Sequence, residues 1–218
     1  MHVPEGVLSG TASGIAVLGA SALVAAAGTA LGLRRMDYER VPRVAMLSAA
    51  FFVASLVQVP LGPTSEHLML NGLVGLVLGW AAFPAILVAL ILQSIFLPVS
   101  SGITTLGLNT LTMALPAVVA HYLFRRAARS DRAAVAFAAG MGAGVVATVL
   151  GAMLLSAALV AVGEGFARVS QVVFALLVSL APVEGLVTAS AVLFLRKVRP
   201  ELLDAPVWRT TPLEVSDG

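Results

Sequence analysis

The chain has 218 residues, of which 59% are hydrophobic and only 11% are charged, and it contains no cysteine. A soluble domain carries about 25% charged residues, so this composition indicates an integral membrane protein, whose helices each need about 20 residues to cross the bilayer. The lack of cysteine excludes disulfides, thiolate metal sites and cysteine nucleophiles. The net charge of +2 comes from arginines beside apolar segments, so it does not indicate a nucleic-acid partner.

The apolar stretches predict an all-α bundle of seven transmembrane helices. In chain order, and to within a few residues, we expect them at 7–33, 43–60, 66–79, 81–97, 104–127, 131–163 and 168–196. The third and fourth are short and meet at Trp80, with Pro84 just beyond, so they could instead form one broken or re-entrant span. The segment 200–218 is polar, and we expect a loose cytoplasmic tail. The residues 1–218 are interpreted as a single transmembrane domain, with the helical bundle over 7–199.

Basic residues orient the predicted bundle in the membrane. They follow the first, fifth and seventh predicted helices, and under a seven-helix count all but one of the 13 Lys and Arg lie on one side. The exception is Arg168. A six-helix count would separate the first two clusters onto opposite faces. The positive-inside rule therefore predicts a cytoplasmic C-terminus and an outside N-terminus.

The first six residues, MHVPEG, contain a candidate metal-chelating segment. No basic residue precedes Arg34, whereas a secretory signal peptide has a basic n-region, so we expect an uncleaved first helix. Met1 is expected to remain because His2 is bulky. Its amine, the amide nitrogen of His2 and Nδ1 of His2 can form two fused, planar chelate rings. Such a set suits metals that prefer square-planar nitrogen ligation, above all Ni(II) or Cu(II).

A fourth planar ligand is predicted at His67, in the stretch LGPTSEHLMLNG. We expect Thr64 or Ser65 to cap the third helix, which places His67 in its first turn and on one face with Asn71. The alternative is an interfacial histidine without a metal, and the helix amino end, which repels cations, argues against a site.

Further polar residues gather at the outward ends of the predicted helices, Gln93 on the fourth and Asn109 on the fifth. Polar side chains are costly in lipid and usually face a bundle interior or cavity. Together with Ser65 and Asn71, they predict a polar outer vestibule into which the N-terminus would fold.

Four stretches resemble the NikM/CbiM family, the substrate-binding S components of energy-coupling factor (ECF) transporters for nickel and cobalt. They are MHVPEG, PTSEHLMLNGLVGLVLGWAAFPAILVALILQSI, TTLGLNTLTMALPAV and APVEGLVTA. The resemblance implies metal ligation by the amine of Met1, the amide and imidazole of His2, and the imidazole of His67, with Gln93 and Asn109 behind the site. It also implies an S-component core with an extra N-terminal helix, in a bacterial inner membrane.

The resemblance further implies a transmembrane coupling subunit, two ABC-type ATPases and, in many members, a small accessory membrane protein. The chain lacks a Walker A loop, so it is interpreted as a non-catalytic subunit. The stretches MHVP and LNTLTMALPAV are closer to the nickel branch, and planar nitrogen ligation suits Ni(II) better than Co(II). We therefore expect Ni(2+) as substrate, with Co(2+) as the alternative and no organic cofactor. A vitamin-binding S component would share the fold without needing a free N-terminus.

Three other residues stand out. Glu184 lies within the seventh predicted helix, where an ionisable group indicates a function, although a neutral acid bonded to a freed backbone group fits as well. His121 precedes the stretch YLFRR and is interpreted as an interfacial residue. Trp80, together with Tyr122, fits the aromatic belt of a membrane protein.

Overall fold

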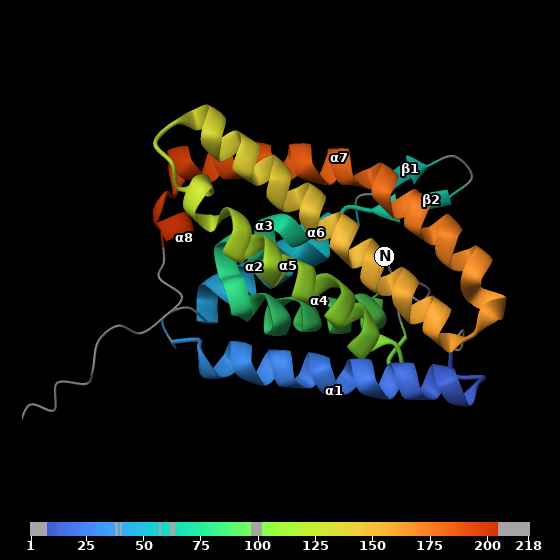
Figure 1. The fold of residues 1–218 in the computed structure, drawn as a ribbon. Helices are drawn as coiled ribbons and strands as arrows, with labels where there is room; N and C mark the ends of the chain where they lie inside the picture. The colour runs from blue at the N-terminus through green and yellow to red at the C-terminus, as the bar shows by residue number, and fades with distance from the viewer. Residues whose placement is uncertain are drawn as a thin grey trace, which may run out of the picture.

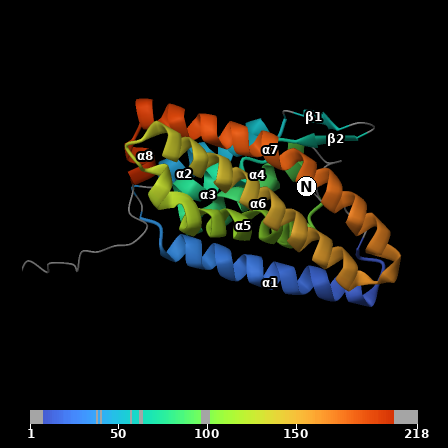
Figure 2. The ribbon, with the colours of Figure 1, turned by 45° about the horizontal axis from the view of Figure 1, so that its top comes forward.

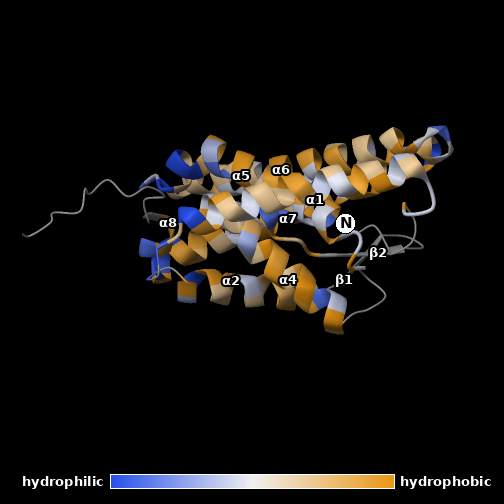
Figure 3. Cartoon of the chain, turned by 90° about the horizontal axis from the view of Figure 1, so that it is seen from below, coloured by the Kyte–Doolittle hydropathy of each residue, from blue (hydrophilic) through white to orange (hydrophobic). Residues whose placement is uncertain are grey.

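The computed structural model describes residues 8–37, 39, 41–56, 58–61, 64–96 and 102–204, and for residues 58–61, 64–67 and 204 it describes the backbone alone. The helices lie side by side in an elongated bundle with a short β-hairpin near one end (Figures 1 and 2). Apolar residues cover the sides of the bundle, and hydrophilic residues gather mainly at its two ends (Figure 3). This distribution is typical of a multi-pass membrane protein.

The described elements run in a simple order. They are α1 (Ala12–Arg34), α2 (Val41–Ala54), β1 (Gln58–Leu61), β2 (Thr64–His67), α3 (Asn71–Leu78), the 3₁₀ turn η2 (Gly79–Ala81), α4 (Ala82–Phe96), α5 (Leu106–Ala128), α6 (Ala133–Val162), the 3₁₀ turn η3 (Glu164–Phe166), α7 (Ala167–Val198) and α8 (Glu201–Asp204). Every one of the seven predicted helices contains an observed helix. Within the described part of the chain, five stretches are long and apolar enough to cross a membrane: α1, Asn71–Phe96, α5, α6 and Glu164–Val198, while α2 is a shorter apolar helix.

The prediction was wrong between the second and third helices. The second helix ends at Ala54 and is followed by an antiparallel hairpin, and the third begins only at Asn71. The expected helix fails here because Pro60 has no amide hydrogen to donate and the following Gly62-Pro63 pair favours a turn. A short apolar run such as this one cannot be assigned to helix or strand from periodicity alone.

The stretch from α3 to α4 turns back on itself. Gly75 lies against the backbone of Ala117, and Gly79 lies against the ring of His121, so α3 and α5 run in the same direction. The chain reverses at Gly79, whose φ of 56° and ψ of −122° suit glycine.

The following helix, α4, runs antiparallel to α1 (Figure 1). Gly32 of α1 packs against the backbone carbonyl of Trp80, just before α4, whereas the earlier Gly28 packs against the ring of Phe83 within α4. Pro84 lies in the first turn of α4, where its missing amide hydrogen removes no helical bond. The predicted break between the third and fourth helices is therefore confirmed, and it joins two helices of opposite direction.

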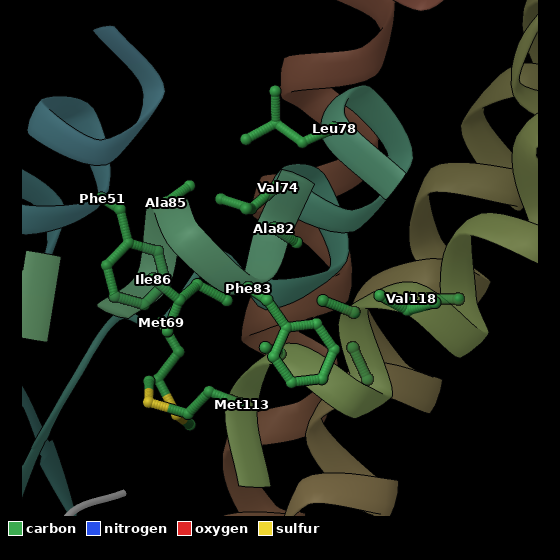
Figure 4. Packing of buried hydrophobic residues seen from close by; sticks show 14 of the residues in the cluster. Phe51, Met69, Val74, Leu78, Ala82, Phe83, Ala85, Ile86, Met113 and Val118 are labelled. Atoms are coloured by element: carbon green, nitrogen blue, oxygen red, sulfur yellow. The ribbon is translucent and has the colours of Figure 1, made fainter. Parts of the chain in front are cut away.

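α5 lies at the centre of the bundle. It packs against α1, α3, α4 and α6, while α6 and α7 form the largest helix pair. The buried apolar cluster extends over these helices, and Figure 4 shows its part around Phe83 and Ile86, where side chains from α2, α3, α4 and α5 meet. Since α3 is almost wholly buried, its backbone ends need partners within the protein.

The aromatic residues predicted for a belt lie at the basic end of the bundle. Trp80 Nε1 donates a hydrogen bond to the hydroxyl of Tyr122 at 2.9 Å. The guanidinium of Arg35 lies 5.1 Å from the Trp80 ring centroid, and that of Arg125 lies 5.3 Å from the Tyr122 ring centroid, both within cation–π range. The carboxyl ends of α1 and α5 therefore lie together, as their shared arginine pattern predicted.

The predicted loose tail is helical at its start, contrary to expectation. Its first residues form α8, in which Leu203 is buried, and Arg129 Nε donates to the carbonyl of Leu203 at 2.6 Å. The short helix is thereby attached to the end of α5. The rest of the predicted tail, residues 205–218, lies outside the described residues.

The reversal at Gly79 gives a stability prediction. An alanine at position 79 would have to adopt a backbone conformation that L-residues avoid. Its Cβ would also lie 3.2 Å from His121 Nε2. We expect Gly79→Ala to lower the free energy of unfolding by about 1–3 kcal/mol, measured by denaturant titration in detergent. Gly19→Ala is the control, since nothing lies within 4 Å of its added Cβ, and it should not destabilise. Equal effects of the two substitutions would contradict the strained-turn interpretation.

Candidate functional site

The hairpin carries His67 at the end of its second strand. The Cα partners across the two strands are Gln58 and His67, Val59 and Glu66, Pro60 and Ser65, and Leu61 and Thr64. His67 therefore does not lie in the first turn of a helix, and it does not share a helix face with Asn71. The expected N-cap at Thr64 or Ser65 is also wrong, because α3 begins only after the strand has ended.

Between β2 and α3 the chain makes a sharp turn at Leu70. This residue has φ of 50° and ψ of 22°, a left-handed conformation with no side-chain cap on the helix. It is the one non-glycine residue with positive φ in the described part of the chain. A left-handed residue costs about 1–2 kcal/mol, so neighbouring contacts must hold the turn in place.

Glu184, from the middle of α7, supplies those contacts. Its Oε1 accepts a hydrogen bond from the amide of Met69, and its Oε2 accepts one from the amide of Leu70 at 3.0 Å. Only 1% of Glu184 is exposed. Both oxygens act as acceptors, as they do in a carboxylate. The expected bond to backbone groups is confirmed, and those groups are the amides of the turn before α3 rather than amides of α7 itself.

The side chain of Met69 anchors the same segment in the core. It is fully buried, and Figure 4 shows it in the cluster with Phe51, Ile86 and Met113. The residue two positions after His67 is thus held twice, by its thioether side chain in the core and by its amide on Glu184.

The polar residues predicted for a vestibule are buried. Asn71 and Gln93 are each 1% exposed, and in the described part of the chain neither end of their amide groups has a hydrogen-bond partner. Asn109 is fully buried, and its Nδ2 donates to Thr105 Oγ1 at 3.4 Å. These amides lie at the start of α3, near the end of α4 and at the start of α5. Given the directions of the three helices, they lie toward the same side of the bundle, away from the arginines.

Buried amides without partners are informative about this region. Leaving one such group unsatisfied costs about 1–3 kcal/mol, so native proteins usually keep them for water, an ion or a ligand. Asn71 and Gln93 therefore support the prediction of polar groups inside this end of the bundle.

His121 is buried rather than interfacial, so that sequence interpretation was wrong. It is 1% exposed, and its Nδ1 lies 3.0 Å from the carbonyl oxygen of Gly75 and 3.3 Å from that of Leu76. Both partners are acceptors, so Nδ1 carries the proton. The helix α3 ends at Leu78, and the carbonyl of Gly75 also accepts a bond from the amide of the capping residue Gly79. His121 from α5 therefore adds a second donor at Gly75 and also reaches the carbonyl of Leu76.

The side chains of the predicted metal ligands lie outside the described part of the chain. Met1 and His2 are outside the described residues, and Ser65 and His67 are described by their backbone. Among the described residues, no group of three or more His, Asp or Glu side chains could hold a metal ion. What sequence reasoning missed is the link between Glu184 and the residues that follow His67, since nothing in a linear pattern pairs two segments so far apart.

Comparison with known proteins identifies the family. Residues 2–202 match the model of the CbiM family, described as the cobalt uptake substrate-specific transmembrane region. The chain belongs to this family. A protein of Haemophilus influenzae named for metal transport is 44% identical over 94% of this chain and 97% of its own length.

Other relatives are named for particular metals. A cobalt transport protein CbiM of Sorangium cellulosum is 34% identical, over 75% of this chain and 76% of its own. A protein of Archaeoglobus fulgidus named as a fused nickel transport protein, NikMN, is 28% identical over 94% of this chain and 68% of its own.

Solved structures share the fold. A crystal structure of a transition metal transporter has a TM-score of 0.66 and 26% identity, with 91% of this chain and 93% of that chain covered. A truncated transition metal transporter has a TM-score of 0.67 at 23% identity, with 90% and 99% covered. This CbiM-family chain is thus a multi-pass membrane protein of a metal-transport family.

The donor role of His121 is testable by substitution. His121→Leu removes the donor to Gly75 and Leu76, and we expect the free energy of unfolding to fall by about 1–3 kcal/mol. His121→Asn can keep an N–H near the position of Nδ1 and should recover part of that loss, as measured by thermal unfolding in detergent. If the leucine variant is as stable as the unchanged protein, His121 does not stabilise the end of α3.

Proposed function

We propose that this chain is the substrate-binding S component of an ECF importer and that it captures Ni(2+) outside the cell. The observation that supports this most is the family match, which includes both His2 and His67. The hairpin end at His67 is also joined to the bundle by a fixed contact. Cobalt is the alternative substrate, since relatives are named for each metal.

The chemistry of the N-terminus favours nickel. The amine of Met1, the deprotonated amide of His2 and Nδ1 of His2 would fill three corners of a plane, and the imidazole of His67 would fill the fourth. Four nitrogen donors in a plane suit Ni(II) better than Co(II). Affinity alone would favour Cu(II), so selection for nickel must come from metal supply.

A seven-span topology with the N-terminus outside is supported by the helix directions. Because α3 and α4 run in opposite directions, Asn71–Phe96 contributes two passes of the chain through the bundle. The basic end of α7 lies beside that of α5, where Arg196 donates to the carbonyl of Asp131 at 3.0 Å. The positive-inside rule makes this end cytoplasmic, and the hairpin end then lies outside.

The energy for import would come from partner proteins. The sequence has no Walker A loop, so we propose that two ABC-type ATPases and a transmembrane coupling subunit assemble with this chain in the bacterial inner membrane. The small accessory membrane protein expected from the resemblance would join them. In this assembly the present chain selects the substrate.

The role of the amine can be tested directly. Acetylation of the Met1 amine removes its lone pair from the metal, and we expect stoichiometric nickel binding to be lost in equilibrium dialysis of the purified protein. Protein with a free amine, prepared in the same way, is the matched control and should bind stoichiometrically. Equal binding by both forms would contradict the N-terminal chelate and leave His67 as the remaining candidate.

The same site predicts a steep pH dependence. Metal binding releases protons from the amine, the amide and the imidazoles, so the affinity for nickel should rise with pH. The amine and imidazole titrate at about pH 8 and about pH 6.5, and above about pH 7 we expect a rise of more than about tenfold per pH unit, since amine and amide protons still leave. A site built from the imidazoles alone would level off there, and titration at several pH values would detect it.

A further inference from the structure

The segment that follows His67 is held by Glu184 at two consecutive amides. Met69 and Leu70 donate to the two oxygens of this carboxylate, which lies on α7, 115 and 114 residues further along the chain. The chain enters α3 immediately afterwards, through the left-handed Leu70. The position of the strand end relative to the bundle therefore depends on this carboxylate.

Glycines allow α7 to approach the start of α3. A Cβ added at Gly72 would lie 2.6 Å from the Cα of Gly144 on α6, and one added at Gly144 would lie 2.7 Å from the Cα of Gly185 and from the carbonyl oxygen of Glu184. Real Cβ atoms essentially never come within 3.0 Å of such an atom, so a side chain at Gly72 or Gly144 would force the helices apart. At these glycines the backbone of α6 packs directly against the backbones of α3 and α7. This close packing brings the side chain of Glu184 within reach of Met69.

We propose that Glu184 is a positioning residue for the metal site, which fixes the strand end carrying His67 and acts through the amides of Met69 and Leu70 without touching the metal. The inference rests on the proposed function and adds a residue to it. Contacts behind metal ligands orient those ligands, and their loss typically weakens metal binding by about 10- to 100-fold.

The test compares nickel affinity and the visible d–d absorption band of the nickel complex in the full-length protein. Glu184→Gln keeps the size of the side chain but presents an NH₂ group, which cannot accept a hydrogen bond, to one of the two donors. We expect about 10- to 100-fold weaker binding, an unchanged stoichiometry and a band displaced toward that of His67→Ala. The matched control is Thr188→Val, because Thr188 lies one turn along α7, is fully buried, and has no partner for its hydroxyl among the described residues.

The results separate this inference from the proposed function. If the unchanged protein and His67→Ala bind nickel alike, the proposed metal site is wrong. If His67→Ala loses affinity but Glu184→Gln matches Thr188→Val in both affinity and band, only the positioning role is wrong. A displaced band in Glu184→Gln supports the role, because a general loss of folded protein reduces the amount of complex without moving its band.

A second pair of variants applies if Glu184→Gln does not fold. Gly144→Ala separates α6 from α7 at Glu184, whereas Gly140→Ala separates them at Ala189, where the added Cβ would also lie 2.7 Å from backbone. We expect Gly144→Ala to weaken nickel binding more than Gly140→Ala does. Equal affinities in the two alanine variants would overturn the proposal.

Discussion

The contact between the carboxylate of Glu184 and the amides of Met69 and Leu70 is the constraint on which the rest of the site depends. It is made in the interior of a membrane protein, where an unpaired amide or carboxylate would be expensive. Each group therefore requires the other. The contact joins α7 to the junction of β2 and α3, and it stabilises a left-handed residue that no local interaction explains.

The same requirement accounts for the opposite end of α3. A short helix has few of its own partners for the amides at its start and the carbonyls at its end, and α3 is almost wholly buried. Glu184 from α7 accepts from the two amides just before this helix, and His121 from α5 adds a donor to the carbonyls of Gly75 and Leu76 in its last turns. Two polar residues that look unrelated in sequence thus perform complementary tasks on one helix.

The distribution of polar groups gives the bundle two different ends. One end combines the arginines of α1, α5 and α7 with the Trp80–Tyr122 pair. Toward the other side lie the hairpin and the buried amides of Asn71, Gln93 and Asn109. Such a polarity agrees with membership of a membrane-protein family.

The sequence alone determined the membrane class, the seven helical segments, the break near Trp80 and the family, because each depends on composition, local periodicity or short motifs. It placed Asn71, Gln93 and Asn109 correctly in the interior, since amides in an apolar span must avoid lipid. It misjudged the region of His67, where Pro60 and a turn replace a helix by a hairpin, and it misread His121. Only the tertiary structure decided which groups Glu184 and His121 satisfy, because a linear pattern reports that a side chain is buried and carries no information about a partner more than 100 residues away.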